Sequence, residues 1–304
     1  MAWHRRDGPT HATVITPVAG NSLTAFCAMA KQRHAARFQT FSHPKRQNSM
    51  TSQIDKAKAF HALHVKGDPV VLYNIWDPGS AAIVAKAGAK AIATGSWPVA
   101  AAFGFADGEK IPLDLVLYNI RRIVAATDLP VTMDLEGGYG VEPEAVAATV
   151  TRALAEGVIG FNFEDQIVGG SGLHDIAVQV KRIAAAADAV KASGIPAFIN
   201  ARTDIFLKAK PDEHSDALVD AAIERAEAYA KAGAHGFFAP GLGNEALIGK
   251  LCKAVSLPVN IIALAHVPPK AKLAELGVGR ISYGPVPYRQ MAEWLEAKAR
   301  AAFE

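Results

Sequence analysis

One pattern recurs along most of this chain: a helix-like stretch ends in a turn, and a short apolar run follows within a few residues. Such connections are typical of the short loops that lead from a helix into a strand. The runs that follow a glycine turn are AGAKAIATG (87–95), EGVIGFNFED (156–165), AGAHGFFAP (232–240) and LGVGRISYG (276–284). The runs introduced by a proline are DPVVLYNI (68–75), LPVTMDLE (129–136), IPAFINARTD (195–204) and LPVNIIAL (257–264).

These runs are almost continuously apolar, which indicates strands that are buried on both faces. A sheet of this kind is parallel and covered by helices. Repeated units of strand and helix over about 250 residues predict an α/β protein with a (β/α)8 TIM barrel as a single catalytic domain, spanning residues 50–304. A doubly wound sheet is the alternative, but no GxGxxG pattern follows the first strand to support it.

Charge is distributed unevenly along the chain. Residues 1–49 hold seven of the 32 Lys and Arg but one of the 29 acids, so residues 50–304 carry 25 basic and 28 acidic residues. This mildly acidic body argues against a nucleic-acid groove. Residues 1–49 show no periodicity and are interpreted as a disordered or misassigned N-terminal extension, with a secretory signal and a transit peptide as alternatives.

Membrane and disulfide classes are disfavoured by the same sequence. No run of 18 or more apolar residues is present, so no membrane span is predicted. The two cysteines, Cys27 and Cys252, are too few for a zinc motif or a disulfide framework. A reducing, cytoplasmic location fits this usage.

The stretch VTMDLEGGYG (131–140) places two carboxylates at the end of one apolar run. Asp134 and Glu136 are two residues apart and therefore share a face of the strand. The glycines that follow allow a ligand to approach the backbone. Two acids beside such a turn indicate a divalent cation, with Mg2+ favoured. Taken alone, the stretch fits a cluster that caps the next helix equally well.

Further polar side chains follow the neighbouring runs. In a TIM barrel the carboxyl ends of all strands meet on one face, where the chemistry gathers. The residues in question are Trp76 and Asp77, Thr94 to Trp97, Asp107 and Glu109 in the next loop, Glu164 and Asp165, and Arg202 and Asp204. Acids this close raise one another's pKa unless a cation or Arg202 compensates. Their position at consecutive strand ends favours a metal site.

The sequence lacks residues that several other reactions catalysed by TIM barrels require. No lysine ends the sixth strand, which argues against a Schiff-base aldolase. The loops after the last two strands lack a glycine-rich phosphate grip, and the ten histidines are scattered. His174, in GGSGLHD, is interpreted first as a helix cap and alternatively as a residue that reaches the barrel mouth.

Taken together and in this order, these motifs resemble those of the isocitrate lyase/phosphoenolpyruvate mutase superfamily, over roughly residues 70–290. The matching segments are TGSW (94–97), GFADGE (104–109), DLEGGYG (134–140), FNFEDQ (161–166) and NARTD (200–204). The resemblance implies metal-side acids at Asp134, Glu136 and Glu164, a catalytic Asp107 near the metal, and an anion contact at Arg202. It also implies substrate contacts at Trp76, Thr94, Gly95 and Ser96.

The segment QIVGGSGLHD (166–175) departs from the family. Lyases of the isocitrate and methylisocitrate type carry a K-K/R-C-G-H loop there, whose cysteine supplies a proton, and this chain has neither Cys nor Lys in it. The mutase and phosphonopyruvate-hydrolase branches have Lys with Asn or Thr, which also do not match. Ser171 is the hydroxyl that can stand in, and a glycine-rich lid remains compatible.

The resemblance implies a Mg2+-dependent enzyme, with Mn2+ as the alternative ion, that acts on a small 2-oxo or 2-hydroxy carboxylate through an enolate. A carbon–carbon lyase or decarboxylase is the first hypothesis, and a phosphonomutase or phosphonopyruvate hydrolase acting on a carbon–phosphorus bond is the second. A non-catalytic metabolite-binding barrel is the third. Family members often exchange a C-terminal helix between subunits; 22 residues follow Ser282, enough for about one helix, and a homo-oligomer is expected.

Overall fold

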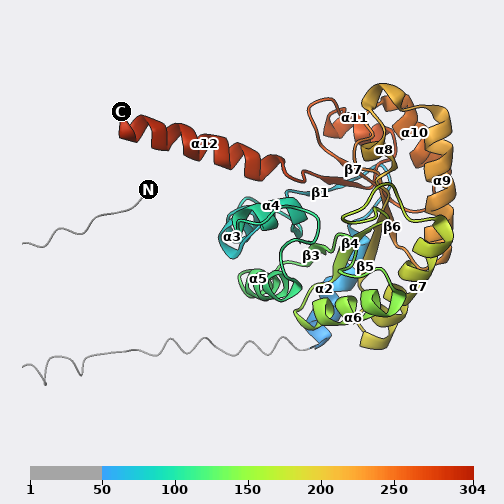
Figure 1. Ribbon diagram of the computed structural model, residues 1–304, viewed down its shortest axis with the longest axis horizontal. Coiled ribbons are helices and arrows are strands. Elements are labelled where there is room, and N and C mark those ends of the chain that lie inside the picture. Colours follow the sequence, from blue (N-terminus) through green and yellow to red (C-terminus); the bar gives the residue numbers. More distant parts are fainter. Residues whose placement is uncertain (1–49) are drawn as a thin grey trace, which may run out of the picture. The chain divides into compact units, whose positions relative to one another are not determined.

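The computed structural model describes residues 50–304, in which eight parallel strands alternate with helices (Figure 1). Every strand lies within one of the apolar runs identified in the sequence. The strands are β1 (Val70–Leu72), β2 (Ile92–Ala93), β3 (Val131–Asp134), β4 (Gly160–Glu164), β5 (Phe198–Arg202), β6 (Gly236–Phe238), β7 (Val259–Ile262) and β8 (Arg280–Ser282). The interpretation of residues 1–49 as an extension lies outside the described residues.

The strands form one sheet that closes almost completely into a barrel. Neighbours pair in parallel in the order β1-β8-β7-β6-β5-β4-β3-β2. The two ends of this order meet through the isolated parallel bridge between Ile75 and Thr94, next to β1 and β2. There Ile75 N donates to the Ala93 carbonyl at 2.9 Å, and Gly95 N donates to the Ile75 carbonyl at 3.3 Å. This topology confirms the predicted TIM-barrel α/β fold.

Helices follow the strands where the local sequence allows them to begin. The Asp77 carboxylate accepts from Ser80 N at 2.6 Å and caps α3, with Pro78 in its first turn. α7 ends at Gly194, whose φ of +71° is the left-handed conformation that favours glycine. The helices are α2 (Met50–Ala62), α3 (Pro78–Lys86), α4 (Ser96–Ala102), α5 (Leu113–Ala125), α6 (Pro143–Ala155), α7 (Ile176–Ser193), α8 (Ile205–Lys208), α9 (Asp216–Lys231), α10 (Glu245–Ala254), α11 (Lys270–Glu275) and α12 (Val286–Phe303), with a 3-10 turn at Pro211–Glu213.

The core has an apolar outer layer and a partly polar interior. On β4 the alternation of side chains separates Phe161 and Phe163 from Asn162 and Glu164. Phe163 lies beneath the Arg182 guanidinium of α7, at 4.9 Å, so the phenylalanine face is the one that the helices cover. Asn162 and Glu164 therefore point into the barrel, and all four residues are buried.

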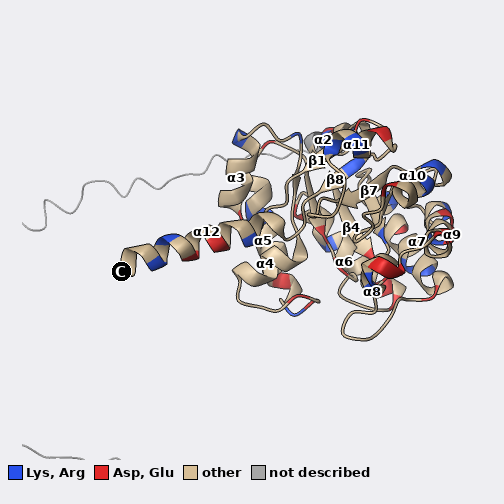
Figure 2. Cartoon of the chain, turned by 90° about the horizontal axis from the view of Figure 1, so that it is seen from above, with Lys and Arg blue, Asp and Glu red and all other residues tan. Residues whose placement is uncertain are grey.

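The last helix, α12, projects from the barrel (Figure 1). Pro287 is its one buried residue, whereas Trp294, Leu295 and Phe303 are exposed. Figure 2 shows both signs of charge along this helix and over the helices that surround the barrel. None of the helices in the described part of the chain is both long and apolar enough to span a membrane.

Candidate active site at the carboxyl ends of the strands

A pocket of about 320 Å³ opens at the carboxyl ends of the strands, as a TIM barrel predicts. Six of the residues singled out in the sequence line it, namely Gly95, Ser96, Trp97, Asp107, Asp134 and Arg202. Apolar side chains complete part of its wall, including Leu207, Phe238, Ile262 and Leu264. The pocket therefore combines charged groups on one side with an apolar surface on the other.

Arg202, at the end of β5, is the cation among these acids. Its Nε and Nη2 donate to the two carboxylate oxygens of Asp204 at 2.5 and 2.9 Å. Its Nη1 lies 2.9 Å from Glu164 Oε2 and 4.0 Å from Asp134 Oδ2. Burial alone would lower its pKa, but Glu164, Asp204 and Asp134 outweigh burial and hold the pKa of Arg202 well above its usual value. The guanidinium therefore stays charged beside the pocket.

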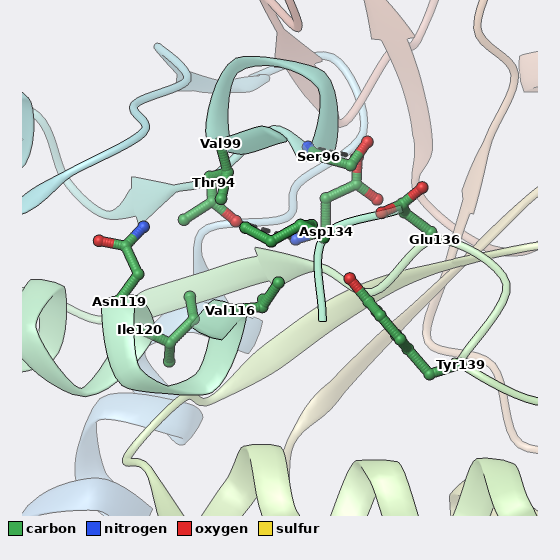
Figure 3. A pocket seen from close by; sticks show the side chains of 10 residues that line it. Thr94, Ser96, Val99, Val116, Asn119, Ile120, Asp134, Glu136 and Tyr139 are labelled. Atoms are coloured by element: carbon green, nitrogen blue, oxygen red, sulfur yellow. Dashed lines mark hydrogen bonds between the residues drawn. The ribbon is translucent and has the colours of Figure 1, made fainter. Parts of the chain in front are cut away.

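Asp134, at the end of β3, has one satisfied carboxylate oxygen and one without a partner. Oδ2 accepts from Ser96 N at 3.2 Å, which joins β3 to the turn after β2. Oδ1 is buried and makes no hydrogen bond within the described chain. Figure 3 shows Asp134 between Ser96 and Glu136, with the Tyr139 hydroxyl directed toward the same acids. The Tyr139 hydroxyl also lacks a partner among the described residues, and both groups line a small cavity of about 10 Å³.

Glu136 anchors the loop that carries Asp107. Its Oε2 accepts from the backbone N–H groups of Gly108 and Glu109, at 3.0 and 2.8 Å. Burial, followed by the charges of Asp134 and Asp107, raises the pKa of Glu136 to about 8. Its φ of +51° is the left-handed conformation that an L-residue seldom adopts, so the fold holds this side chain in place at some cost. The anchoring role was not predicted from the sequence.

Two more acids complete the cluster. Burial and the neighbouring Asp134 raise the pKa of Asp107. Burial also raises the pKa of Glu164, with Asp204 and Asp134 adding to the shift and the Arg202 guanidinium opposing it. Glu164 is 3% exposed. With Asp204 included, five carboxyl groups therefore cluster with the single guanidinium of Arg202 at this end of the barrel.

Two predicted substrate contacts lie beside the pocket in supporting positions. The Thr94 hydroxyl accepts from Asp134 N at 3.1 Å, so it links β2 to β3. Trp76 packs edge-to-face against Tyr288 of α12, with ring centroids 4.9 Å apart. Thr94 lines the small cavity shown in Figure 3. Neither Thr94 nor Trp76 lines the pocket of 320 Å³, whose wall includes Trp97.

The segment after β4 does not bring Ser171 or His174 to the pocket in this conformation. Ser171 is exposed, and the segment folds back on itself through an antiparallel bridge between Gln166 and Leu173. The backbone of His174 is held by Asp165 and Arg225, with His174 N donating to the Asp165 carbonyl at 2.8 Å. Burial and the charge of Arg182 lower the pKa of His174. Neither residue lines the pocket.

Asn162 and Arg289 are among the lining residues that the sequence reasoning missed. Asn162 lies two residues before Glu164 on β4, so the alternation of side chains along the strand puts both on one face, a signal that could have found Asn162. Arg289 lies in the first turns of α12, and its guanidinium stacks over Trp97 at 4.9 Å. No motif marks Arg289, because its place depends on where α12 leaves the barrel.

The residues of the pocket fit a hydrated Mg2+ ion. In the described part of the chain, no three His, Cys, Asp or Glu side chains are grouped so that they could hold a metal. Mg2+ does not require such a group, because it usually keeps several waters and takes one or two carboxylates from the protein. The unpartnered Oδ1 of Asp134 is a hard oxygen ligand, and a cation bound beside it would offset the repulsion among the surrounding acids.

The fold and the site together define a class: a TIM barrel with an acidic, Arg-containing pocket at the carboxyl ends of its strands. Residues 60–303 match the family described as phosphoenolpyruvate phosphomutase. The chain therefore belongs to that family, within the phosphoenolpyruvate mutase/isocitrate lyase superfamily.

Proteins similar to this chain carry different names. The 2-methylisocitrate lyase of Escherichia coli is 30% identical over 216 residues, covering 69% of this chain and 71% of the lyase. The crystal structure of a "putative phosphonomutase" from Burkholderia cenocepacia has 49% identity and a TM-score of 0.81, covering 82% of this chain and 99% of that one. A phosphonopyruvate hydrolase complexed with oxalate and Mg2+ shares the fold at 21% identity and a TM-score of 0.71, covering 81% of this chain and 87% of the hydrolase.

Proposed function

We propose that this protein is a Mg2+-dependent enzyme that acts on a small 2-oxo or 2-hydroxy carboxylate through an enolate, as a carbon–carbon lyase or a decarboxylase. The observation that carries the proposal is that one pocket is lined by both Arg202 and Asp134, whose Oδ1 has no hydrogen-bond partner among the described residues. A guanidinium recognises a carboxylate, and the free carboxylate oxygen suits a hard cation. The lyase named above supports the reaction type.

The chain's own residues account for binding and orientation. Arg202 presents Nη1 toward the acids, while its remaining donors are fixed on Asp204 and hold the side chain in one position. Asp134 would hold Mg2+, with Asp107, Glu136 and Glu164 as the other acids of the site. When bound, Mg2+ polarises the oxo oxygen and stabilises the negative charge that develops there.

Glu136 contributes by fixing the position of the loop. Because its carboxylate holds Gly108 N and Glu109 N, Asp107 is kept at the pocket wall. Hydrogen bonds of this kind restrict the geometry of a reacting group, which favours catalysis. The apolar wall at Phe238, Ile262 and Leu264 excludes water from the opposite side.

A phosphonomutase or phosphonopyruvate hydrolase that acts on a carbon–phosphorus bond is the second candidate. The phosphonomutase-like relative at 49% identity favours it, and the absence of Cys from residues 166–175 weighs against the lyases. Under either chemistry, we propose that Ser171 and His174 act only after the segment at residues 166–175 has moved toward the pocket. A non-catalytic metabolite-binding barrel is the third candidate, motivated by the exposed position of Ser171.

Two incubations separate these candidates. The purified protein is mixed with Mg2+ and either oxaloacetate or phosphonopyruvate, with EDTA as a control. Pyruvate and CO2 from oxaloacetate support the decarboxylase, and inorganic phosphate from phosphonopyruvate supports the alternative. Metal binding without turnover of either compound favours the binding protein. If neither compound reacts and EDTA changes no measured property, both enzyme proposals fail.

The metal assignment has its own test. Asp134→Ala should remove most of the Mg2+ affinity measured by isothermal titration calorimetry. Asp114→Ala is the matched control, because Asp114 is an exposed acid whose side chain pairs only with Arg152 within the described chain. Unchanged Mg2+ affinity in Asp134→Ala contradicts the assignment.

We also infer that the protein works as a homo-oligomer through α12. This helix exposes Trp294 and Leu295, at 61% and 54%. On the barrel, a groove of about 720 Å³ has an apolar lining that includes Val71, Ile83 and Val84. Exposed apolar surfaces of this kind mark sites of association. Packing α12 of one copy against another copy would bury both surfaces.

Light scattering after size-exclusion chromatography tests the oligomer. The double variant Trp294→Glu/Leu295→Glu should elute as a smaller species, whereas the charge reversal Lys298→Glu on the same helix should leave the mass unchanged. A monomeric wild-type protein would contradict the inference.

A further inference from the structure

A band of polar side chains crosses the interior of the barrel directly below the acids of the pocket. Asn162 of β4, Asn200 of β5, Asn260 of β7 and Arg280 of β8 are each at most 4% exposed. The strand register aligns Asn162 with Asn200, and Asn260 with Arg280. Asn200 Nδ2 joins the band by donating to Asn162 Oδ1 at 2.9 Å and to Asn260 Oδ1 at 3.1 Å. Polar groups therefore replace an apolar layer at this level.

Arg280 is a cation without an ionic partner. Its Nη2 donates to Asn162 Oδ1 at 3.1 Å, and its Nε and Nη1 make no hydrogen bond within the described chain. No carboxylate of the described residues lies within 4 Å of it. Burial lowers the pKa of Arg280 to about 9, with the charge of Asp134 acting in the opposite sense, so the guanidinium remains protonated at neutral pH. A buried and unpaired charge is costly, which requires an explanation beyond packing.

The contact between Arg280 and Asn162 fixes the orientation of the Asn162 amide. A guanidinium can only donate hydrogen bonds, so the atom of Asn162 that faces it must be the carbonyl oxygen. Asn200 approaches the same oxygen with a donor, which reinforces this assignment. The amino group Nδ2 is then on the other side of the amide, and it makes no hydrogen bond to any described protein group. Asn162 lines the pocket, next to Asp134 in the strand register.

Asn260 shows what a purely structural asparagine looks like in the same band. Its Oδ1 accepts from Asn200, and its Nδ2 donates to Ser282 Oγ at 3.1 Å and to the Ile261 carbonyl at 3.0 Å. Both ends of this amide are used inside the barrel, and Asn260 does not line the pocket. Asn162 differs in both respects, because it lines the pocket and one end of its amide is unused.

We propose that Asn162 is a further catalytic residue, whose Nδ2 donates a hydrogen bond to the anionic oxygen of the bound oxo acid or enolate, and that Arg280 is the positioning residue that holds it. This inference rests on the proposed function of the same pocket. The donation from Arg280 polarises the Asn162 amide, and a polarised amide is a stronger donor at its other end. The positive charge below the pocket thereby supports negative charge on the ligand without contacting it.

Calorimetric titration of oxalate into the protein with saturating Mg2+ tests the proposal. Hydrogen bonds to charged groups are strong enough that Asn162→Ser should weaken oxalate binding by about tenfold or more. Asn162→Asp should weaken it further, because it places a second negative charge there. Asn260→Ser is the matched control: it lowers the melting temperature but leaves oxalate affinity within about twofold of the wild-type value. Mg2+ affinity without oxalate should be unchanged in Asn162→Ser.

The positioning role of Arg280 is tested by two further variants. Arg280→Met removes the donor to Asn162 and should weaken oxalate binding by about three- to tenfold. Arg280→Lys retains a donor and should restore at least half of the lost binding free energy. If the role of Arg280 is merely structural, the two substitutions change the melting temperature and leave the oxalate affinity unchanged.

A crystal structure of the wild-type complex with Mg2+ and oxalate decides the contact even if a variant fails to fold. An Asn162 Nδ2 to oxalate oxygen distance near 3 Å supports the proposal. A distance beyond about 4 Å, or oxalate binding by Asn162→Ser within twofold of wild type, overturns it while the proposed function stands. Failure of the wild-type protein to bind oxalate with Mg2+ instead overturns the proposed function, and this inference with it.

Discussion

Protonation of Glu136 should make a measurable contribution to the free energy of unfolding. Its pKa is raised from 4.5 to about 8, mainly by burial and then by Asp134 and Asp107. Folding therefore favours the protonated carboxyl. The stabilisation from this proton is fully present below pH 4.5 and is lost as the pH rises through 8. Replacing Glu136 by Gln makes the neutral form permanent and retains an oxygen that can accept from Gly108 N and Glu109 N.

The magnitude follows from the shift. One pKa unit corresponds to about 1.4 kcal/mol. At pH 7.5 the pH lies roughly three units above the pKa of Glu136 in the unfolded state, whereas the folded state still holds most of the proton. The raised pKa therefore lowers the free energy of unfolding by at most about 4 kcal/mol at this pH. Sharing of charge with Asp134 and Asp107 reduces this to about 1–3 kcal/mol. For a domain of this size, Glu136→Gln should raise the melting temperature of the metal-free protein by about 3–8 °C at pH 7.5.

Differential scanning calorimetry in EDTA at pH 7.5 and pH 5 tests the reasoning. The difference between Glu136→Gln and wild type should shrink to about 1 kcal/mol or less at pH 5, because both proteins are then protonated at this position when folded. Glu142→Gln, an exposed acid at the start of α6, should change the melting temperature little at either pH. A destabilised Glu136→Gln protein at pH 7.5, or a gain that does not depend on pH, would refute the explanation.

Three further outcomes are expected. Burial lowers the pKa of His64 to about 3, so the unfolded state binds a proton first as the pH falls below 6.5, and the wild-type protein loses stability. His64→Phe lacks this loss. Between pH 7 and pH 5 its free energy of unfolding, measured with urea, should therefore fall by about 1–2 kcal/mol less than that of the wild type. Arg202→Lys, which cannot make the same bidentate contact with Asp204, should lower kcat/KM by about 100-fold or more in whichever of the two assays is positive. Gly138→Ala should destabilise the fold by about 2 kcal/mol, since φ is +86° and a Cβ there would lie 2.9 Å from the Phe163 ring; an unchanged denaturation midpoint would contradict this.

The barrel was predictable from the sequence because its signals are local and repeated. Each strand lies inside an apolar run that follows a glycine or proline. Glu164, expected from its place at the end of the fourth apolar run, is the last residue of β4. Because parallel strands end on one face, the acids of several strands were expected to be neighbours, and the structure brings Asp107, Asp134 and Arg202 to one pocket.

The division of labour among the site residues could not be read from the sequence. A motif does not reveal that Glu136 holds backbone N–H groups of a loop, because that loop approaches through tertiary structure. The same applies to Thr94, whose hydroxyl accepts from Asp134 N. Arg289 was missed since its position depends on the direction in which α12 leaves the barrel. Ser171 and His174, proposed as catalytic, lie away from the pocket in this conformation, and their role remains a prediction.

The incomplete closure of the barrel has a dynamic consequence for the pocket. Opening between the two ends of the sheet disrupts the short pairing around Ile75 and Thr94, whereas β4 and β5 pair along five residues each. The turn at Gly95 and Ser96 is attached to that lightly bonded edge. Amide hydrogen exchange at Gly95 should therefore exceed that in β5 by orders of magnitude. We therefore expect the pocket wall at Gly95 and Ser96 to open with less free energy than the wall formed by β4 and β5.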